Sequence, residues 1–167
     1  MRIKTLAVVL LFCAGCAPAT VEEKQSVDST RRALGAEPVA MRSILQESYT
    51  GVRDPQRTVL KDGTAWADFW RTAYATRGEV PELPSVNFDN EMVVVASLGT
   101  RGSGGYTIHL DSARISSGML AIFVRSVSPG PACFTTQALT QPVAAAAMSR
   151  SQLPLRFVEQ HETHDCS

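Results

Sequence analysis

The residues that most resemble a chemical motif are the closely spaced glycines of LGTRGSGGYTIHL, residues 98–110. A glycine-rich loop binds phosphate when it opens a helix, because the helix N-terminus receives the phosphate group. Here the loop leads into an alternating apolar segment, which is typical of a strand, and no Walker lysine is nearby. A nucleophile elbow around Ser103 fails as well, since Arg101 occupies the position of its first glycine. The stretch therefore predicts neither a phosphate site nor a nucleophilic serine.

A second near match is HETHDC at the C-terminus, which is one residue too short for the zinc motif H-E-x-x-H. His161 and His164 are three residues apart instead of four, in a polar segment that we interpret as a surface tail. The third histidine, His109, points outward from a predicted strand, and no acidic pair has the spacing of a general acid and base. We therefore predict no catalytic residue, no metal site and no cofactor, and we expect that the protein is not an enzyme.

The chain begins with the features of a bacterial secretion signal. Two basic residues precede an apolar run at 6–12, which is too short for a stable membrane-spanning helix, and small residues follow. They end in Cys16, which resembles the lipobox cysteine that is lipidated in lipoproteins, although Cys13 stands where a leucine is usual. We predict a lipoprotein signal peptide over residues 1–15 and lipidation of Cys16, with an ordinary secreted protein as the alternative.

A lipidated Cys16 would hold the protein in the cell envelope, because several acyl chains satisfy the need for more than one lipid anchor. Ala17 follows the cysteine, and the absence of aspartate there resembles an outer-membrane address. We therefore expect an outer-membrane protein that faces the periplasm or the surface and contacts the membrane only through its lipid anchor.

The charge balance argues against nucleic acid as a partner. The chain has 16 basic and 16 acidic residues, and loss of the leader's two basic residues leaves 14 against 16, a net charge of −2. A slightly acidic chain without a basic cluster lacks the electrostatic footprint of a nucleic-acid-binding protein.

Two cysteines, Cys133 and Cys166, remain once the leader is removed and Cys16 is lipidated. An even pair in an oxidising compartment predicts a disulfide. The bridge would close a loop of about 34 residues and stabilise the fold by roughly 3–4 kcal/mol.

Apolar periodicity divides the rest of the chain into two parts. Residues 16–45 lack a sustained period, and we interpret them as the lipidated cysteine followed by a flexible tether. Residues 46–167 have the length of one compact domain. One amphipathic helix and several short strands predict an α+β domain with a mainly antiparallel sheet, either sandwich-like or a partly closed barrel.

The spacing of five apolar residues predicts a helix, because they share one helical face. We interpret this face as part of the core; its residues are Trp66, Phe69, Trp70, Ala73 and Tyr74. Asp62 or Thr64 can cap its start, and Gly78 can end it. The continuous apolar run 92–98 predicts a central strand covered on both faces. Further strands are predicted at 58–60, 106–110 and 120–124, in QPVAAAAMSR and in LRFVEQ.

The order of these segments resembles the C-terminal domain of the PrcB family, which is named for a subunit of a bacterial surface protease complex. The resemblance covers residues 49–159. Its most specific part is residues 98–106, where a strand ends, an Arg/Ser/Gly-rich loop follows and the next strand begins. The family often has proline where Gly102 stands. The resemblance implies a non-catalytic partner of a protease or of another envelope protein.

The glycine-rich loop is the predicted protein-binding site, and its residues are Gly99, Arg101, Ser103, Gly104, Gly105 and Tyr106. Gly104 and Gly105 permit positive φ or close backbone approach, so the chain can reverse sharply between two strands. Arg101 and Ser103 then lie at the tip and Tyr106 at the root. Arginine and tyrosine are frequent interface anchors.

Four interpretations of the chain stay open. The favoured one is a tethered protein-interaction module, a subunit or stabiliser of a surface protease complex. The second is a protease inhibitor that inserts the 99–106 loop, together with residues 129–133, into an active-site cleft. The third is a hydrolase whose site the sequence conceals, and the fourth is a plain hairpin without a partner.

Overall fold

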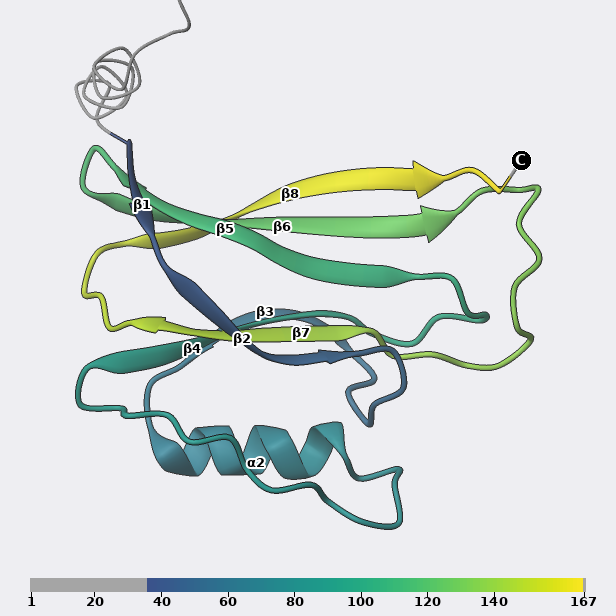
Figure 1. Cartoon of the computed structure of the whole chain (residues 1–167), viewed down its shortest axis with the longest axis horizontal. Helices are drawn as coiled ribbons and strands as arrows, with labels where there is room; N and C mark the ends of the chain where they lie inside the picture. Colours follow the sequence, from purple (N-terminus) through teal and green to yellow (C-terminus); the bar gives the residue numbers. More distant parts are fainter. Residues whose placement is uncertain (1–35, 167) are drawn as a thin grey trace, which may run out of the picture. The chain divides into compact units, whose positions relative to one another are not determined.

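Residues 36–166, which the computed structural model describes, fold as two stacked four-stranded β-sheets with a helix beneath one of them (Figure 1). Sheet I has the strand order β1-β5-β6-β8, and sheet II has the order β2-β7-β4-β3. All neighbours in sheet II are antiparallel, whereas β6 and β8 of sheet I run parallel. The strands are β1 (Ala36–Val39), β2 (Met41–Glu47), β3 (Pro55–Leu60), β4 (Glu91–Leu98), β5 (Thr107–Ser116), β6 (Met119–Pro129), β7 (Val143–Ser149) and β8 (Leu155–His164).

The two central strands of sheet II, β4 and β7, are buried on both faces. Val94 and Ala146 lie in the core between the sheets, while Val93 and Ala145 lie in a second core under the helix. The continuous apolar run of β4 is explained by this double cover, and the prediction of a central strand covered on both faces is confirmed. The α+β sandwich is confirmed too. The sheets keep separate edge strands, so the fold is not a closed barrel.

Helix α2 (Gly63–Ala73) covers the outer face of sheet II with the aromatic residues that the sequence assigned to the core. Trp66 and Trp70 are 1% and 5% exposed, so their rings are structural. Each indole N–H donates to a backbone carbonyl of the segment that follows the helix, Trp66 to Pro84 at 3.1 Å and Trp70 to Pro81 at 2.9 Å. These bonds satisfy the polar edge of each buried ring.

The helix begins as predicted and ends earlier than predicted. The Asp62 carboxylate accepts the N–H of Ala65 at 2.8 Å, which makes Asp62 the N-cap. The last helical residue is Ala73, not a residue near Gly78. The carbonyl of Ala73 accepts the N–H of Gly51 at 2.9 Å, so a tertiary hydrogen bond replaces the next helical one.

Strands β1 and β2 lie in the segment that was interpreted as the end of the tether. β1 pairs with β5 in sheet I, and β2 pairs with β7 in sheet II, so this short segment contributes an edge strand to each sheet. The tether prediction is therefore wrong for residues 36–45. Most side chains of the two strands are half-buried or exposed, and no apolar alternation marks them in the sequence. Residues 1–35, with the predicted signal peptide and Cys16, lie outside the described residues.

The C-terminal histidine segment is a strand, which corrects its interpretation as a polar tail. β8 adds to the edge of sheet I parallel to β6, with His161 opposite Ser126. Polar residues are tolerated there because the outer side of an edge strand faces solvent. Within residues 36–166, no helix has the length and apolar character needed to cross a membrane.

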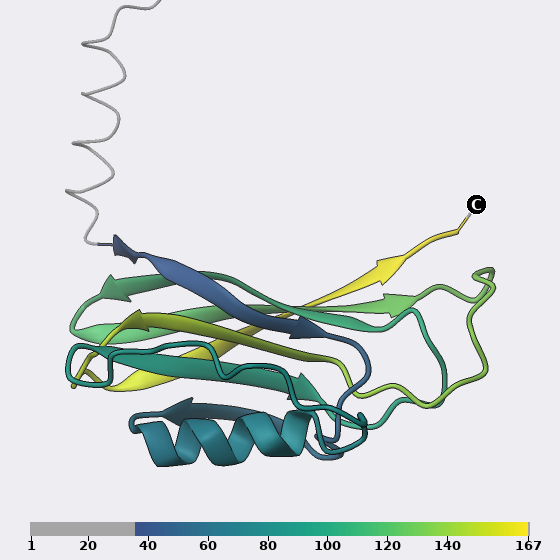
Figure 2. The same cartoon turned by 60° about the horizontal axis from the view of Figure 1, so that its bottom comes forward.

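Three connecting loops lie at the same end of the sandwich, which we call the loop end (Figure 1). They are residues 48–54 between β2 and β3, residues 99–106 between β4 and β5, and residues 130–142 between β6 and β7. The described chain begins at the other end, where Ala36 pairs with Ser116 at the far end of β5. The turned view in Figure 2 shows the same separation.

Candidate protein-binding site

The 99–106 loop links the two sheets instead of joining neighbours in one sheet. β4 pairs with β3 and β7 in sheet II, whereas β5 pairs with β1 and β6 in sheet I. The hairpin interpretation of this loop is therefore wrong. A connection that changes sheets must cross the thickness of the sandwich, about 10 Å in face-to-face packed sheets.

Three of the four glycines of this loop are required by backbone conformation or by close packing. Gly99 and Gly105 have φ of 68° and 88°, in the left-handed region that favours glycine. A Cβ added to Gly105 would lie 3.0 Å from the Cβ of Pro129. Gly104 lacks a positive φ, but a Cβ there would collide with the hydroxyl of Thr136. Gly102 is unconstrained, since no heavy atom lies within 4 Å of its added Cβ.

A ladder of hydrogen bonds fastens the 99–106 loop to the 130–142 loop. Arg101 and Thr140 exchange backbone bonds of 2.8 and 3.1 Å, and the N–H of Gly104 donates to the carbonyl of Thr136 at 2.9 Å. The hydroxyl of Thr140, itself buried, donates to the carbonyl of Ser103 at 2.8 Å. The two loops are therefore one structural unit, and the glycine-rich loop does not project alone.

Arg101 is half-buried in this unit, so its predicted place at a solvated tip is wrong. Its guanidinium carbon lies 5.6 Å from the ring centroid of Tyr106, within the range of a cation–π contact. Its Nε is buried and has no hydrogen-bond partner in the structure. No ion pair of Arg101 is formed among residues 36–166. Arg101 thus packs inside the loop end, with its charge partly withdrawn from solvent.

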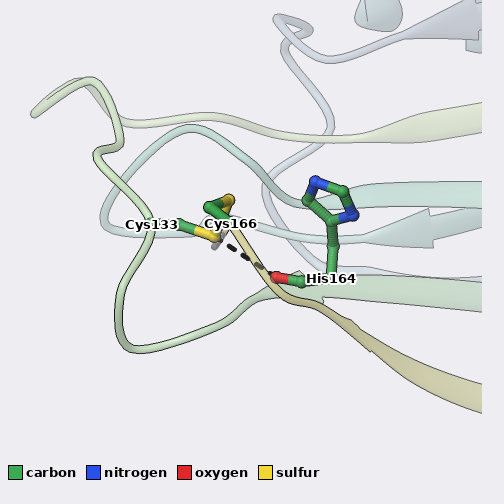
Figure 3. The surroundings of a disulfide bond; sticks show 3 residues. All are labelled: Cys133, His164 and Cys166. Atoms are coloured by element: carbon green, nitrogen blue, oxygen red, sulfur yellow. Dashed lines mark hydrogen bonds between the residues drawn. A yellow bond between two sulfur atoms is a disulfide. The ribbon is translucent and has the colours of Figure 1, made fainter.

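A disulfide joins Cys133 to Cys166, as the cysteine count predicted (Figure 3). The bridge ties the 130–142 loop to the residues that follow β8, with a Cα–Cα distance of 4.9 Å. Close to it, the N–H of Gly130 donates to the carbonyl of His164 at 2.8 Å. The 130–142 loop is therefore held to sheet I at one side and to the 99–106 loop at the other.

The third loop, residues 48–54, is bonded to the same unit. The hydroxyl of Thr50 donates to the carbonyl of Gln141 at 2.8 Å, and the N–H of Gln141 donates to the carbonyl of Ser48 at 2.9 Å. The N–H of Thr100 donates to the carbonyl of Arg53 at 2.9 Å. Each of the three loops therefore positions the others.

The loop end carries the three most exposed large apolar side chains of the described residues. Phe134 is fully exposed (106%), Leu139 is 64% exposed and Tyr49 is 49% exposed. Phe134 and Leu139 belong to the 130–142 loop and Tyr49 to the 48–54 loop. Sequence reasoning missed all three, because a single apolar residue in an irregular loop has no periodicity that distinguishes an exposed ring from a buried one.

One serine–histidine pair bears on the hydrolase interpretation. The Oγ of Ser126 lies 2.5 Å from Nδ1 of His161, across the parallel pair β6 and β8. A hydrolase needs an accessible serine and a third group that orients the histidine. Ser126 is only 7% exposed, and no carboxylate within residues 36–166 bonds to His161. This pair gives the hydrolase interpretation no specific support.

A cavity of about 470 Å³ opens between β2 and β5, and its lining includes Met41, Gln46 and His109 but no residue of the three loops. No group of three or more histidine, cysteine, aspartate or glutamate side chains within residues 36–166 is arranged to hold a metal ion.

Fold and site together define an α+β sandwich domain with a disulfide-bonded set of loops at one end. Residues 92–149 match the family model described as PrcB C-terminal, which confirms over this segment the resemblance inferred from the sequence. The matched segment runs from β4 to β7 and contains the whole 99–106 and 130–142 loops. Neither the curated proteins nor the solved structures include a match to the chain.

Proposed function

We propose that the protein is a non-catalytic envelope lipoprotein whose folded domain is a protein-interaction module, a subunit or stabiliser of a surface protease complex. The PrcB C-terminal match supports the link to a protease complex, because the matched segment contains two of the three loops at the loop end. The predicted lipidation of Cys16 and signal peptide over residues 1–15 supply the envelope location in this proposal.

The observation that carries the proposal is the exposure of Phe134, Leu139 and Tyr49 on loops that are bonded together. Exposed apolar side chains on a set of bonded loops offer apolar surface that a partner protein can bury. Loops that are already ordered lose little conformational entropy when they bind, so more of the contact energy appears as affinity. A loop end of this kind suits recognition of a folded protein.

The test is purification of the full-length, lipidated protein from its native membranes in mild detergent, after cross-linking in the cells. We expect an envelope protease to be recovered with it in a fixed ratio, and deletion of the lipoprotein to lower the amount of that protease. Recovery of the lipoprotein alone, with the protease unchanged in the deletion strain, would contradict the proposal. A Cys16→Ser variant tests the anchor, because we expect it in the soluble fraction.

The inhibitor hypothesis in its original form has less support. Insertion of the 99–106 loop into a cleft requires a free backbone, but Arg101 and Gly104 are hydrogen-bonded to Thr140 and Thr136. An inhibition assay with the co-purified protease separates the two functions. A subunit or stabiliser leaves the activity intact or raises it, whereas an inhibitor lowers it.

A further inference from the structure

We propose that Phe134 is the anchor through which the domain docks, and that the partner is a protein presenting an uncharged apolar pocket deep enough for a phenyl ring. This inference rests on the proposed function and names the contact by which it is carried out. The proposed contact lies in the 130–142 loop. The 99–106 loop, with Arg101 and its glycines, holds the 130–142 loop in place by hydrogen bonds.

The exposure of Phe134 is the first argument. Its side chain is fully exposed (106%), and the next most exposed large apolar side chain among the described residues, Leu139, is 64% exposed. An aromatic ring brings a large apolar area to an interface, and few internal rotations are lost when it binds. The ring contributes no packing within the domain, so its surface is free for a partner.

The attachment of the loop on both sides of Phe134 is the second argument. The preceding residue, Cys133, is bridged to Cys166, and its N–H donates to the carbonyl of Gly130 at 3.0 Å. Two residues after the phenylalanine, the carbonyl of Thr136 accepts the N–H of Gly104. A ring held on a fixed backbone in this way is preorganised for a pocket of matching shape.

The chemistry of the loop defines the partner. Residues 129–142, PGPACFTTQALTQP, contain no acidic, basic or histidine residue. In the 99–106 loop that is bonded to it, the one basic residue is Arg101, which is half-buried and packs on Tyr106. The Asp165 carboxylate lies beside Gly130, before the loop reaches Phe134. A neutral apolar loop is complemented by a neutral apolar pocket, and its binding depends little on ionic strength.

The composition of the loop favours a protein over the lipid bilayer. The loop lacks the lysines and arginines with which surface-bound segments attract anionic lipids.

The test begins with a photoreactive phenylalanine analogue at position 134 of the full-length protein in cells, with the analogue at Met119 as the matched control. Met119 is also an exposed apolar residue, at the opposite end of the sandwich. We expect one protein adduct from position 134 that is absent from position 119. An adduct of two copies of this chain, a lipid adduct, or no adduct would each overturn the inference.

The cross-linked partner is then purified and titrated with the Cys16→Ser protein and its variants. We expect Phe134→Ala to weaken binding at least tenfold and Leu139→Ala a few fold, with Met119→Ala unchanged. Thermal unfolding of the Phe134→Ala variant should match that of the parent, because the ring packs on nothing. Raising sodium chloride from 50 to 500 mM should change the affinity less than about threefold. A large salt effect, or equal binding by Phe134→Ala, would overturn the inference.

The same Cys16→Ser protein is mixed with vesicles of phosphatidylethanolamine and phosphatidylglycerol. We expect no Phe134-dependent binding to the vesicles. Binding that Phe134→Ala abolishes would show that the ring contacts the membrane instead.

The experiments distinguish failure of the further inference from failure of the proposed function. If a partner binds the domain and Phe134→Ala binds equally well, the interaction module stands and its assigned anchor is wrong; if no partner binds at all, the proposed function fails.

Discussion

The backbones of Arg101 and Thr140 form an isolated β-bridge between two loops that are far apart in the sequence. Because of this bridge, the 99–106 loop does not project freely into solvent but holds the 130–142 loop in position. The side chain of Arg101 then lies over Tyr106, with its Nε buried. An arginine held in this way stabilises the loop end more than it contacts a partner.

Arg101→Ala should therefore lower stability, which the sequence alone did not predict. We expect a loss of about 1 kcal/mol in the free energy of unfolding, from the buried stem and the cation–π contact. Arg101→Met should lose less, because it keeps an apolar stem and removes the unpaired Nε donor. Chemical denaturation measures both. If Arg101→Ala leaves stability unchanged but weakens partner binding tenfold, Arg101 is an exposed interface anchor and not a stabilising residue.

The sequence predicted correctly those features that are determined by residues close together in the chain. The spacing of Trp66, Phe69 and Trp70 predicts a helix because a 3.6-residue period puts them on one face, and the structure buries that face. The apolar run of β4 predicts a strand covered on both sides because each of its faces meets a different core. The disulfide could be predicted because only Cys133 and Cys166 remain once Cys13 is assigned to the leader and Cys16 to lipidation, and a pair left in an oxidising compartment is expected to be bridged.

Features that depend on distant pairing could not be predicted. β4 is bonded to β7, which lies far along the chain, and this pairing decides that the 99–106 loop changes sheets. The burial of Arg101 follows from its bridge to Thr140, and no local pattern encodes that contact. Phe134 looks like many buried phenylalanines in sequence. Its exposure is a property of the folded loop end.

The glycines of the 99–106 loop allow a paired test of backbone strain. Gly105→Val should cost at least about 2 kcal/mol, because valine tolerates the φ of 88° poorly and its Cβ would crowd Pro129. Gly102→Ala should change stability by less than about 0.5 kcal/mol, because no heavy atom lies within 4 Å of its added Cβ. Thermal melts of both variants measure the contrast, and equal destabilisation would mean that the loop conformation is wrong.

The disulfide should stabilise the domain and order its C-terminal strand. Cys133→Ser should lower the free energy of unfolding by about 3 kcal/mol, because the unfolded chain gains the entropy of an open loop. Cys166→Ser should have the same effect, and the double variant should lose no more than either single one. Amide hydrogen exchange should rise at the C-terminal end of β8. A reducing agent that leaves the stability of the parent protein unchanged would contradict this role.

Stability in acid should depend on the ion pair of Arg57 and Glu159, which joins β3 at the edge of sheet II to β8 at the edge of sheet I. Two guanidinium nitrogens of Arg57 donate to the Glu159 carboxylate at 2.7 and 2.9 Å. The hydrogen bond from Arg57 holds the pKa of Glu159 below its ordinary value of 4.5, with burial opposing the change. The folded state thus binds this proton less readily than the unfolded state.

The contribution of this pair is present above pH 4.5 and is lost as pH falls through the lowered pKa of Glu159. Glu159→Gln should therefore be less stable than the parent at pH 7, and the difference should shrink towards pH 3. Glu82→Gln is the control, because Glu82 is exposed and forms no ion pair within residues 36–166. Urea unfolding at each pH measures all three proteins. A difference between parent and Glu159→Gln that stays constant from pH 7 to pH 3 would show that the Glu159 carboxylate does not couple folding to protonation.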